Sequence, residues 1–463
     1  MKRHLLCSSL LALLLLPSAA RAGEQPDCGL ECLICPELAN PAQYAEGVMK
    51  SLEVLAPGKD NWLFRSSFDL ANDFGIPTPM FAEFARLMDT FAAQGTQVAI
   101  FLQPTRGMIH RDKIRADYDY GFDFPRARMS LEQFQTQLRR GGALVPDILP
   151  LVNNPPAEEY FFRRDHHWTP AGARATARIV ADFLRQQPLH AELAPKSYRT
   201  EPGIIMPKDG TMNRGLRHIC GNNYGFQYVP AYQTVPESDD IGALLDDDSE
   251  PEVVLVGTSN SAARDDEAKS YNFDGFLKEY LGVDILNYAL PGAGQDGALL
   301  QYLQSADYDP SAPPKLIVWE LPANFRLENE LSYRQLIPAI KGGCATARTI
   351  ARHSLKVPPL GEHQRLEIFA NAGARRQDLR NVQGFFELRL DDPDLKDFYV
   401  ITYYDNGARD KVWYRREAIV NGGLYYLEMS RAAQFRGANL LSVFIEPTEA
   451  WNKPTALEFK LCQ

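Results

Sequence analysis

Beyond its first residues, the 463-residue chain lacks any apolar run close to the roughly 20 residues that a membrane-spanning helix needs. It also lacks an excess of basic residues, because its formal charge is −10 at pH 7, and this argues against a general nucleic-acid binder. Internal repeats are absent. What is left is a globular chain, long enough for two domains with separate cores.

The N-terminal segment is typical of an exported protein. A basic start, "MKRH", precedes the short apolar run "LLCSSLLALLLLPSAARA", which ends on small residues. We predict a signal peptide over residues 1–22, cleaved before Gly23. The mature protein is therefore expected to be soluble and to lie outside the cytoplasm.

Cysteines are scarce, and Cys7 leaves with the signal peptide. An even number in an exported chain favours disulfide bonds over metal or redox use. The spacing in "CLIC" also occurs in redox and zinc motifs, but here it has no strand-to-helix context. The six mature cysteines are Cys28, Cys32, Cys35, Cys220, Cys344 and Cys462.

Apolar periodicity divides the chain into two parts. Up to about residue 341, strand patterns alternate with helix patterns, which predicts a parallel sheet covered on both faces. The predicted helices are 81–95, 170–187, 272–282 and 294–305, and the predicted strands are 97–102, 251–257, 283–289 and 314–322. Residues 197–240 give no clear pattern. Later, short aromatic and β-branched runs at 385–392, 398–405, 412–420, 424–430 and 440–447 predict an all-β sandwich.

Histidines are also few, yet two of the eight stand together in "RRDHHW" at residues 163–168. Thr169 and Pro170 form a strong helix start directly afterwards, so this segment is expected to be a loop. Metal ligands, an acid–base pair and a satisfied core are all open interpretations.

A second informative stretch is "VVLVGTSNSAA" at residues 253–263. Ser259 follows a predicted buried strand, where open α/β folds place reactive groups. A serine nucleophile needs a base to take its proton and a third group to orient that base. His167 is the candidate base and Asp165 the candidate orienting group. The ordinary alternative for Ser259 is a turn or helix-capping hydroxyl.

The neighbours of this pair are expected to play supporting roles. His166 is predicted to point away, because alternate side chains of an extended loop face opposite sides. Trp168 is predicted to pack or to form a pocket wall. A metal site would need three or four converging ligands, with His110, His190 or His218 joining Asp165 and His167. No recognised zinc spacing links them, so we predict neither a metal nor a cofactor.

These motifs resemble a known family. A strand followed by "GTS", a glycine turn in "ALPGAG" and an Asp-x-His pair are found in the SGNH or GDSL-like esterases. In most of those enzymes the Asp-His segment follows the serine, whereas here it precedes the serine by more than ninety residues. That order, with the signal peptide, "IVWELP" and a cysteine-bracketed β module, resembles the periplasmic alginate O-acetyltransferases of the AlgX type over nearly all the mature chain.

The resemblance implies specific roles. Asp165, His167 and Ser259 match its catalytic triad, and the expected location becomes the periplasm. The places of the oxyanion donors fall on Ser259, Gly292 and Asn324, although the usual motif around the asparagine is absent. Tyr271 is a further pocket candidate because it follows the nucleophile closely.

The cysteines receive partners from the same resemblance. Cys35 with Cys220, and Cys344 with Cys462, match the disulfides of the family, and the second bond would tie the ends of the β module together. The pattern of the family assigns no partners to Cys28 and Cys32, and a local bridge between these two is the remaining expectation.

The charge of the chain is unevenly distributed. From Cys344 to the end there are 17 Lys+Arg against 15 Asp+Glu, a net of +2, which leaves −12 for residues 1–343. Alginate is a polyuronate, so an acidic enzyme must meet it with local basic residues and aromatic rings. "ARDKVWYRR" offers these, and alternate residues of a strand would share one face; the ordinary alternative is a solvated strand with a core tryptophan. The predicted polymer contacts are Arg163, Arg164, Tyr403, Arg409, Lys411, Trp413 and Arg415.

We therefore expect an α/β, SGNH-hydrolase-like parallel-sheet domain over residues 23–342 and an all-β, sandwich-type carbohydrate-binding module over 343–463. The predicted function is O-acetylation of mannuronate residues in alginate through an acetyl-serine, with binding of the polymer during its export. Other periplasmic alginate acetylation and export proteins are the expected partners. The alternatives are a carbohydrate acetyl esterase, which uses water as acceptor, and a non-catalytic polymer-binding scaffold of a secretion complex.

Overall fold

The computed structural model describes residues 34–237, 251–264, 266, 269–373, 376–380, 382–420 and 422–463. The predicted signal peptide, Cys28 and Cys32 lie outside these residues. Among the helices of the described ranges, none has the length and apolarity needed to cross a membrane.

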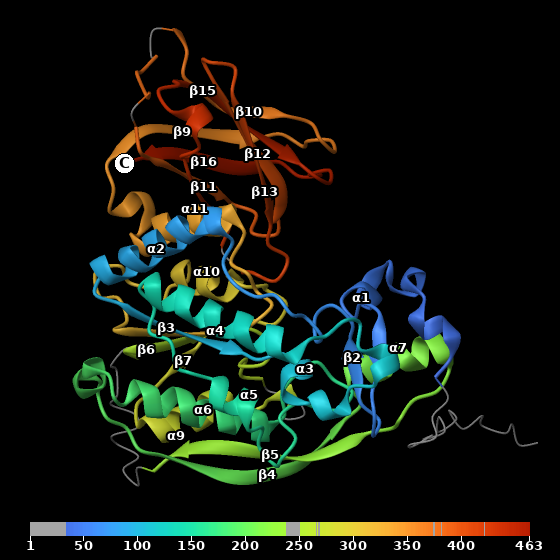
Figure 1. The fold of residues 1–463 in the computed structure, drawn as a ribbon. Helices are drawn as coiled ribbons and strands as arrows, with labels where there is room; N and C mark the ends of the chain where they lie inside the picture. The colour runs from blue at the N-terminus through green and yellow to red at the C-terminus, as the bar shows by residue number, and fades with distance from the viewer. Residues whose placement is uncertain are drawn as a thin grey trace, which may run out of the picture.

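A four-stranded parallel sheet forms the centre of the first part of the chain (Figure 1). Its order is β3 (Gln97–Gln103), β8 (Leu316–Pro322), β6 (Val253–Val256) and β7 (Leu286–Asn287). Every residue of β6 and β8 is buried. Such runs without alternation are expected where helices cover both faces of a sheet. The strand predicted over 283–289 is present only as the two-residue β7.

Helices cover both faces of this sheet. In Figure 1, α2 (Thr78–Ala93), α10 (Gly297–Leu303) and α11 (Glu330–Ile340) lie on one side, and α6 (Pro170–Leu184) and α9 (Phe273–Leu281) lie on the other. The Thr169 hydroxyl accepts a hydrogen bond from Gly172 N, so α6 begins where its cap was predicted. Within the described residues, the other α-helices are α1 (Gly47–Lys50), α3 (Arg106–Ile109), α4 (Phe124–Arg140), α5 (Leu149–Asn153) and α7 (Thr211–Cys220).

The segment without a clear sequence pattern forms a two-stranded ribbon. β4 (Tyr198–Lys208) pairs antiparallel with β5 (Gln227–Pro236), and α7 lies between them in the chain. Most residues of both strands are at least partly exposed, so the sequence shows no alternation of apolar and polar residues that would predict them. The disulfide Cys35–Cys220 ties the N-terminal segment to the end of α7, beside the hairpin of β1 (Leu55–Pro57) and β2 (Leu63–Arg65).

The C-terminal part contains two antiparallel four-stranded sheets. One has the order β10-β15-β12-β13 and the other β14-β11-β16-β9. A second apolar core includes side chains of both sheets. The strands are β9 (Thr349–Val357), β10 (Leu366–Ala370), β11 (Phe385–Leu390), β12 (Asp397–Tyr404), β13 (Arg409–Arg415), β14 (Leu424–Glu428), β15 (Leu440–Pro447) and β16 (Thr455–Cys462). The predicted fold class, a parallel-sheet domain followed by a β-sandwich, is confirmed.

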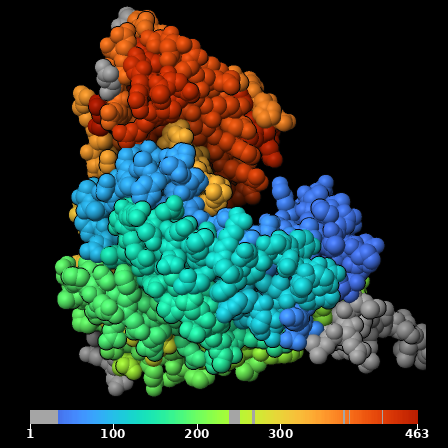
Figure 2. Space-filling model, in the orientation of Figure 1, coloured from blue at the N-terminus to red at the C-terminus, as the bar shows by residue number. Residues whose placement is uncertain are grey.

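The two parts are packed tightly against each other. Figure 2 shows the C-terminal module seated on α2, with a recess between the module and the segment that carries α1. Phe385 and Tyr426 of the module belong to the core of the first part. Arg86 of α2 pairs with Glu428 at 2.6 Å, and the disulfide Cys344–Cys462 closes the module. The module is thus held against the first part by apolar and ionic contacts, and the disulfide joins its own two ends.

Candidate functional site

Ser259 lies on a loop that begins directly after β6. Glu320 of the adjacent strand β8 holds this loop, because its carboxylate accepts hydrogen bonds from Thr258 N at 2.6 Å and Thr258 Oγ1 at 2.8 Å. A Cβ atom at Gly257 would lie 2.7 Å from Glu320 Oε2, so this close approach requires glycine. Ser259 itself is partly exposed. The carboxyl end of the sheet therefore presents the hydroxyl toward solvent.

A buried guanidinium holds the loop that carries Asp165 and His167. Arg106 is 1% exposed, and its Nη1 donates to the carbonyl oxygens of Phe162 and Asp165 at 2.6 and 2.7 Å. Its Nη2 donates to the carbonyls of Leu63 and Arg163 at 2.8 and 3.1 Å. One side chain thus joins β2 to the loop and sets the path of the loop.

The three predicted side chains meet at the carboxyl end of the sheet. His167 Nε2 lies 2.8 Å from Ser259 Oγ, and His167 Nδ1 lies 2.5 Å from Asp165 Oδ1. The other oxygen, Asp165 Oδ2, accepts a hydrogen bond from Thr211 N at 2.8 Å. This is the geometry in which a carboxylate orients an imidazole and the imidazole takes a proton from a hydroxyl.

The electrostatics agree with those roles. Burial opposes ionisation of Asp165, yet the contact with His167 and the nearby Lys208 hold the pKa of Asp165 well below its usual value. Burial lowers the pKa of His167, against the pull of Asp165. At neutral pH the pair therefore consists of a carboxylate and a neutral imidazole, which is the state that accepts a proton.

His166 does not point away from the site, contrary to the prediction. The loop bends at this residue, so the alternation of an extended strand does not apply. Its ring lies 3.8 Å from the ring of His167, and its Nδ1 is 2.8 Å from Thr211 Oγ1. Trp168 is fully buried and donates to the carbonyl of Asn260 at 2.9 Å, as expected of a packing residue.

A metal would find one cluster of ligands here. Donor atoms of Asp165, His166 and His167 all lie within 4.8 Å of one another. These atoms already have partners: His166 Nδ1 contacts Thr211 Oγ1, and His167 contacts Asp165 through Nδ1 and Ser259 through Nε2. His110, one proposed further ligand, instead accepts a hydrogen bond from Phe161 N at 3.2 Å, and its ring lies 4.1 Å from the Trp62 ring. The arrangement fits acid–base chemistry better than a metal centre.

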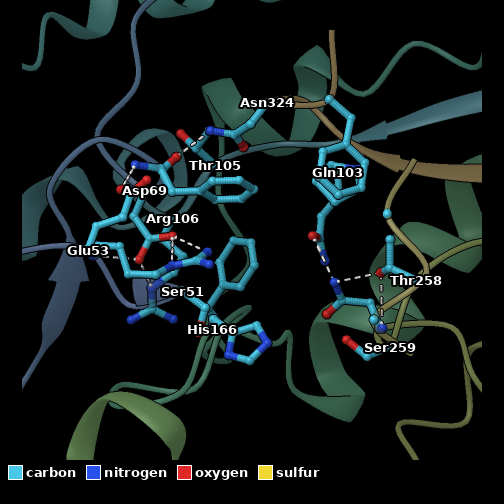
Figure 3. A pocket seen from close by; sticks show the side chains of 18 of the residues that line it. Ser51, Glu53, Asp69, Gln103, Thr105, Arg106, His166, Thr258, Ser259 and Asn324 are labelled. Carbon is cyan, nitrogen blue, oxygen red and sulfur yellow. Dashed lines mark hydrogen bonds and ion pairs between the residues drawn. The ribbon is translucent and has the colours of Figure 1, made fainter. Parts of the chain in front are cut away.

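Ser259 opens into a cavity of about 450 Å³. Figure 3 shows Asp69 and Arg106 on one side of it and Gln103, Thr258 and Ser259 on the other. Its walls are partly aromatic, with rings from Phe68, Phe161 and Phe325. The basic side chains that line it are Lys50, Arg65 and Arg106.

Two backbone amides at the cavity are available as donors. Across the described ranges, neither Ser259 N nor Gly292 N donates a hydrogen bond within the protein. Gly292 has φ +77°, a conformation that favours glycine. Both residues line the cavity, so their N–H groups suit an oxyanion.

Asn324 and Tyr271 have other partners than the sequence suggested. Asn324 lines the cavity, but its amide donates to the carbonyl of Phe68 at 2.5 Å. Tyr271 is 2% exposed and does not line the cavity. Its ring packs 5.3 Å from His167, and its hydroxyl accepts a hydrogen bond from Lys208 Nζ. Tyr271 therefore packs against the imidazole of His167 from outside the cavity.

Arg163 and Arg164 do not line the cavity, which corrects their predicted contact with a substrate carboxylate there. Arg163 pairs with Glu159 at 2.6 Å, and Arg164 is 5% exposed, near the ring of Tyr224. The bend that brings His166 inward turns both arginines aside. Basic side chains reach the cavity instead from the N-terminal segment, at Lys50 and Arg65.

The predicted polymer-contacting side chains of β13 share one exposed face. Lys411, Trp413 and Arg415 alternate with buried residues, and Trp413 is 45% exposed, so it is not a core tryptophan. Tyr399 stacks on Trp413 at 5.7 Å, and Lys411 Nζ lies 3.9 Å from the centre of the Tyr399 ring. This face therefore presents two stacked rings with a cation packed against one of them.

Two more predicted contacts lie on the same sheet. Arg409 begins β13 and is exposed, while Tyr403 is partly buried and accepts a hydrogen bond from Arg365 at 3.0 Å. Glu446 of β15 is nearly buried between Lys411 and Arg365, at 2.7 and 2.5 Å. These ion pairs fix the basic side chains beside the rings.

Sequence reasoning missed several residues of the site. Arg106, Lys208, Glu320 and Lys50 each lie far along the chain from the residues that they support or join at the cavity. Of these, Glu320 alone had a local signal in the sequence. A carboxyl group inside the apolar run "LIVWELP" is costly to bury unless it has hydrogen-bond partners. The other three had none.

Known proteins resemble the chain over nearly all its length. Residues 55–323 match the model of an SGNH hydrolase-like domain of acetyltransferase AlgX, and residues 343–463 match a C-terminal carbohydrate-binding module. The alginate biosynthesis protein AlgX of Pseudomonas fluorescens is 33% identical over 440 residues, which cover 93% of this chain and 88% of that protein.

Two further comparisons agree. The probable alginate O-acetylase AlgJ of Pseudomonas putida is 29% identical over 293 residues, 59% of this chain and 71% of that protein. The solved structure of Pseudomonas aeruginosa AlgX is similar with a TM-score of 0.82 at 30% identity, and covers 93% of this chain and 99% of that one.

Proposed function

The chain belongs to the family of AlgX, with its SGNH hydrolase-like acetyltransferase domain, and on that premise we propose that it acetylates alginate through Ser259, His167 and Asp165. The observation that carries the proposal is the continuous contact from Asp165 Oδ1 through His167 to Ser259 Oγ, at 2.5 and 2.8 Å. The predicted limits of the signal peptide and of the two domains, and a location in the periplasm, belong to the same proposal.

The first half of the reaction forms an acetyl-serine. Ser259 Oγ attacks the carbonyl carbon of an acetyl ester while its proton passes to His167 Nε2. The negative oxygen of the tetrahedral intermediate accepts hydrogen bonds from Ser259 N and Gly292 N. The carbon–oxygen bond to the donor alcohol then breaks, and His167 returns the proton to that leaving oxygen. The acetyl group remains on Ser259 as an ester.

The second half reverses these steps with a sugar as acceptor. A mannuronate hydroxyl attacks the acetyl-serine and gives its proton to His167. The bond to Ser259 Oγ breaks, and the serine oxygen recovers the proton. Asp165 stabilises the imidazolium in both halves. The same residues would hydrolyse the ester if water took the place of the hydroxyl, and this is the esterase alternative.

Lys50 supports a polyuronate acceptor. It lines the cavity, is exposed, and forms no ion pair with any described residue, so its ammonium can meet a sugar carboxylate. Arg65 lines the same wall but is held by Asp69 at 2.7 Å. Lys50 is thus the better carboxylate contact next to the reacting hydroxyl.

A chain of cavities supports polymer binding across both domains. Gly292 and Ala293 border the cavity of Ser259 and also a second one of about 260 Å³ that reaches Arg415. Ala293 and Arg415 border a third, also about 260 Å³, which includes Trp413. A polymer that passes over the 292–293 turn would therefore contact the aromatic face of β13 while one unit lies at Ser259.

The proposal is tested with p-nitrophenyl acetate as donor and polymannuronate as acceptor. Wild-type protein should place acetyl groups on the polymer, and intact mass should detect an acetyl adduct that Ser259→Ala lacks. Ser261→Ala is the matched control and should still form the adduct. Acetylation of polymer by Ser259→Ala would overturn the serine mechanism. Release of free acetate alone, with polymer present, would favour the esterase, and polymer binding without either product would favour the scaffold.

A further inference from the structure

A lysine lies beside the contact between Asp165 and His167. Lys208 ends β4, and its side chain is only 12% exposed. Its Nζ lies 4.0 Å from Asp165 Oδ1, the oxygen that also binds His167 Nδ1. Its Nζ donates a hydrogen bond to the hydroxyl of Tyr271 at 2.5 Å and lies 5.1 Å from the centre of the Phe162 ring. The ammonium is therefore fixed in place.

The groups around His167 come from several separate segments of the fold. Asp165 Oδ2 is bound by the backbone N–H of Thr211, while Oδ1 accepts a hydrogen bond from His167 N at 3.0 Å and also faces His167 Nδ1 and Lys208 Nζ. Within the described part of the chain, the ion pairs of Asp165 are those with His167 and Lys208. The charged or titratable groups that act on this imidazole or its neighbour are Asp165 and His166 of the same loop, Lys208 of β4, Arg264 after β6, Tyr271 before α9, and Arg65 of β2.

This arrangement changes the charge balance of an ordinary triad. Where a carboxylate faces only an imidazole, its full charge favours the imidazolium. Here Lys208 already compensates Asp165, so a proton on His167 would create a second cation against one buried anion. An unpaired charge is costly when it is buried away from water, so this excess positive charge is unfavourable. His167 is accordingly disfavoured as an imidazolium in the resting protein.

We propose that Lys208 is a positioning residue that shares Asp165 with His167 and keeps the imidazole in its basic form. The inference rests on the proposed role of His167 as the base. In the reaction, a weaker hold on the imidazolium also makes it a better acid, so it gives its proton readily to the leaving oxygen. The burial and the charges of Lys208 and Arg264 lower the pKa of His167, in line with this role.

The test separates charge from structure. Lys208→Gln keeps a donor to Tyr271 but removes the charge, Lys208→Arg keeps the charge, and Tyr271→Phe removes the acceptor while the ammonium stays. The titration of His167 is followed by ¹H–¹⁵N NMR in the full chain carrying Ser259→Ala, without substrate. Hydrolysis of p-nitrophenyl acetate against pH is followed in the same variants with Ser259 intact.

We expect Lys208→Gln to raise the measured pKa of His167, and the acid limb of the rate profile, by about 1. Lys208→Arg should restore both toward wild type, and Tyr271→Phe should leave both close to wild type. A Gln variant with the wild-type pKa of His167 would overturn the proposal. Equal effects of Lys208→Gln and Tyr271→Phe would also overturn it, because they indicate a purely structural role.

Two further readings keep the test decisive. If Lys208→Gln does not fold, the wild-type titration can still refute the proposal, because the proposal requires His167 to titrate below its usual value of about 6.5. A wild-type value above that would refute the inference. If the NMR shift appears but no acetyl group reaches polymer, the proposed function fails and the charge sharing stands. If polymer is acetylated but the pKa of His167 is unchanged in Lys208→Gln, the proposed function stands and the charge sharing fails.

Discussion

Replacing Arg106 tests whether one buried guanidinium holds the site together. Arg106 donates to four carbonyl oxygens, those of Leu63, Phe162, Arg163 and Asp165, at 2.6 to 3.1 Å. Burial lowers the pKa of Arg106 to about 10, so it is still charged at neutral pH. Arg106→Met removes every one of these donors but keeps most of the volume.

The magnitude follows from the carbonyls left unsatisfied. A buried polar group without its partner costs about 1 to 3 kcal/mol. The carbonyl of Arg163 keeps a hydrogen bond from Leu63 N at 3.0 Å, so three carbonyls lose their partner and together cost about 4 kcal/mol. Asp69 also loses a cation at 3.2 Å, although Arg65 still holds it. We expect a loss of about 5 kcal/mol in the free energy of unfolding, a large part of the roughly 5 to 15 kcal/mol typical of a folded protein.

The assay is thermal and urea unfolding followed by circular dichroism. Loss of about 5 kcal/mol should lower Tm by roughly 10 °C or more in a domain of this size. Arg163→Met is the matched control, because its ion pair with Glu159 is about one-third exposed and contributes about 1 kcal/mol or less. Equal shifts in the two variants would refute the reasoning. Arg106→Lys should recover little, since an ammonium cannot span four carbonyls.

Three further predictions concern the module, the nucleophile loop and a disulfide. Trp413→Ala should weaken polymannuronate binding about tenfold in affinity electrophoresis while Tm stays unchanged, because the ring is 45% exposed; unchanged binding would remove β13 from the polymer path. Burial raises the pKa of Glu320 to about 7, so the stability due to its protonated form is complete below its unfolded pKa and is lost as the pH rises through about 7. In urea unfolding, the free energy of unfolding of the wild type should fall by on the order of 3 kcal/mol between about pH 4.5 and 7, and that of Glu320→Gln should not. The same fall in Glu320→Gln would contradict this. Replacing Cys344 and Cys462 by serine opens a loop of 118 residues and should lower the stability of the module by about 4 kcal/mol, which equal urea midpoints would disprove.

Deleting the module is a poor test of polymer binding, because it would damage the first domain. Phe385, Ile419 and Tyr426 are part of the core of that domain, and Arg334 of α11 pairs with Asp410 at 2.6 Å. Point variants on the exposed face of β13 change the polymer contacts without exposing this core.

Local patterns explain why much of the fold could be predicted. The continuous apolar runs at β6 and β8 and the capped start of α6 depend only on nearby residues. Three strands of the sandwich, β9, β10 and β16, were not predicted. Nearly all residues of β9 and β10 are at least partly exposed, so only pairing with neighbours reveals these two strands. β16 does alternate apolar and polar side chains, and this signal was missed.

The loop of Asp165 shows where local reasoning stops. Alternation along an extended strand predicted that His166 faces away and left Arg163 and Arg164 near the substrate. The loop bends instead, since the guanidinium of Arg106 and the backbone N–H of Thr211 bind it from distant segments. No nearby residue contains that information.

The sequence by itself determined the chemistry of the three groups, because an acid two residues before a histidine, and a serine after a buried strand, limit what such side chains can do. Only the tertiary structure decided that they meet, since Ser259 and His167 are 92 residues apart and are joined through the order of the parallel sheet. It also decided what surrounds them. Lys208 lies beside Asp165 because β4 ends there, and Glu320 lies beneath Ser259 because β8 is the neighbour of β6.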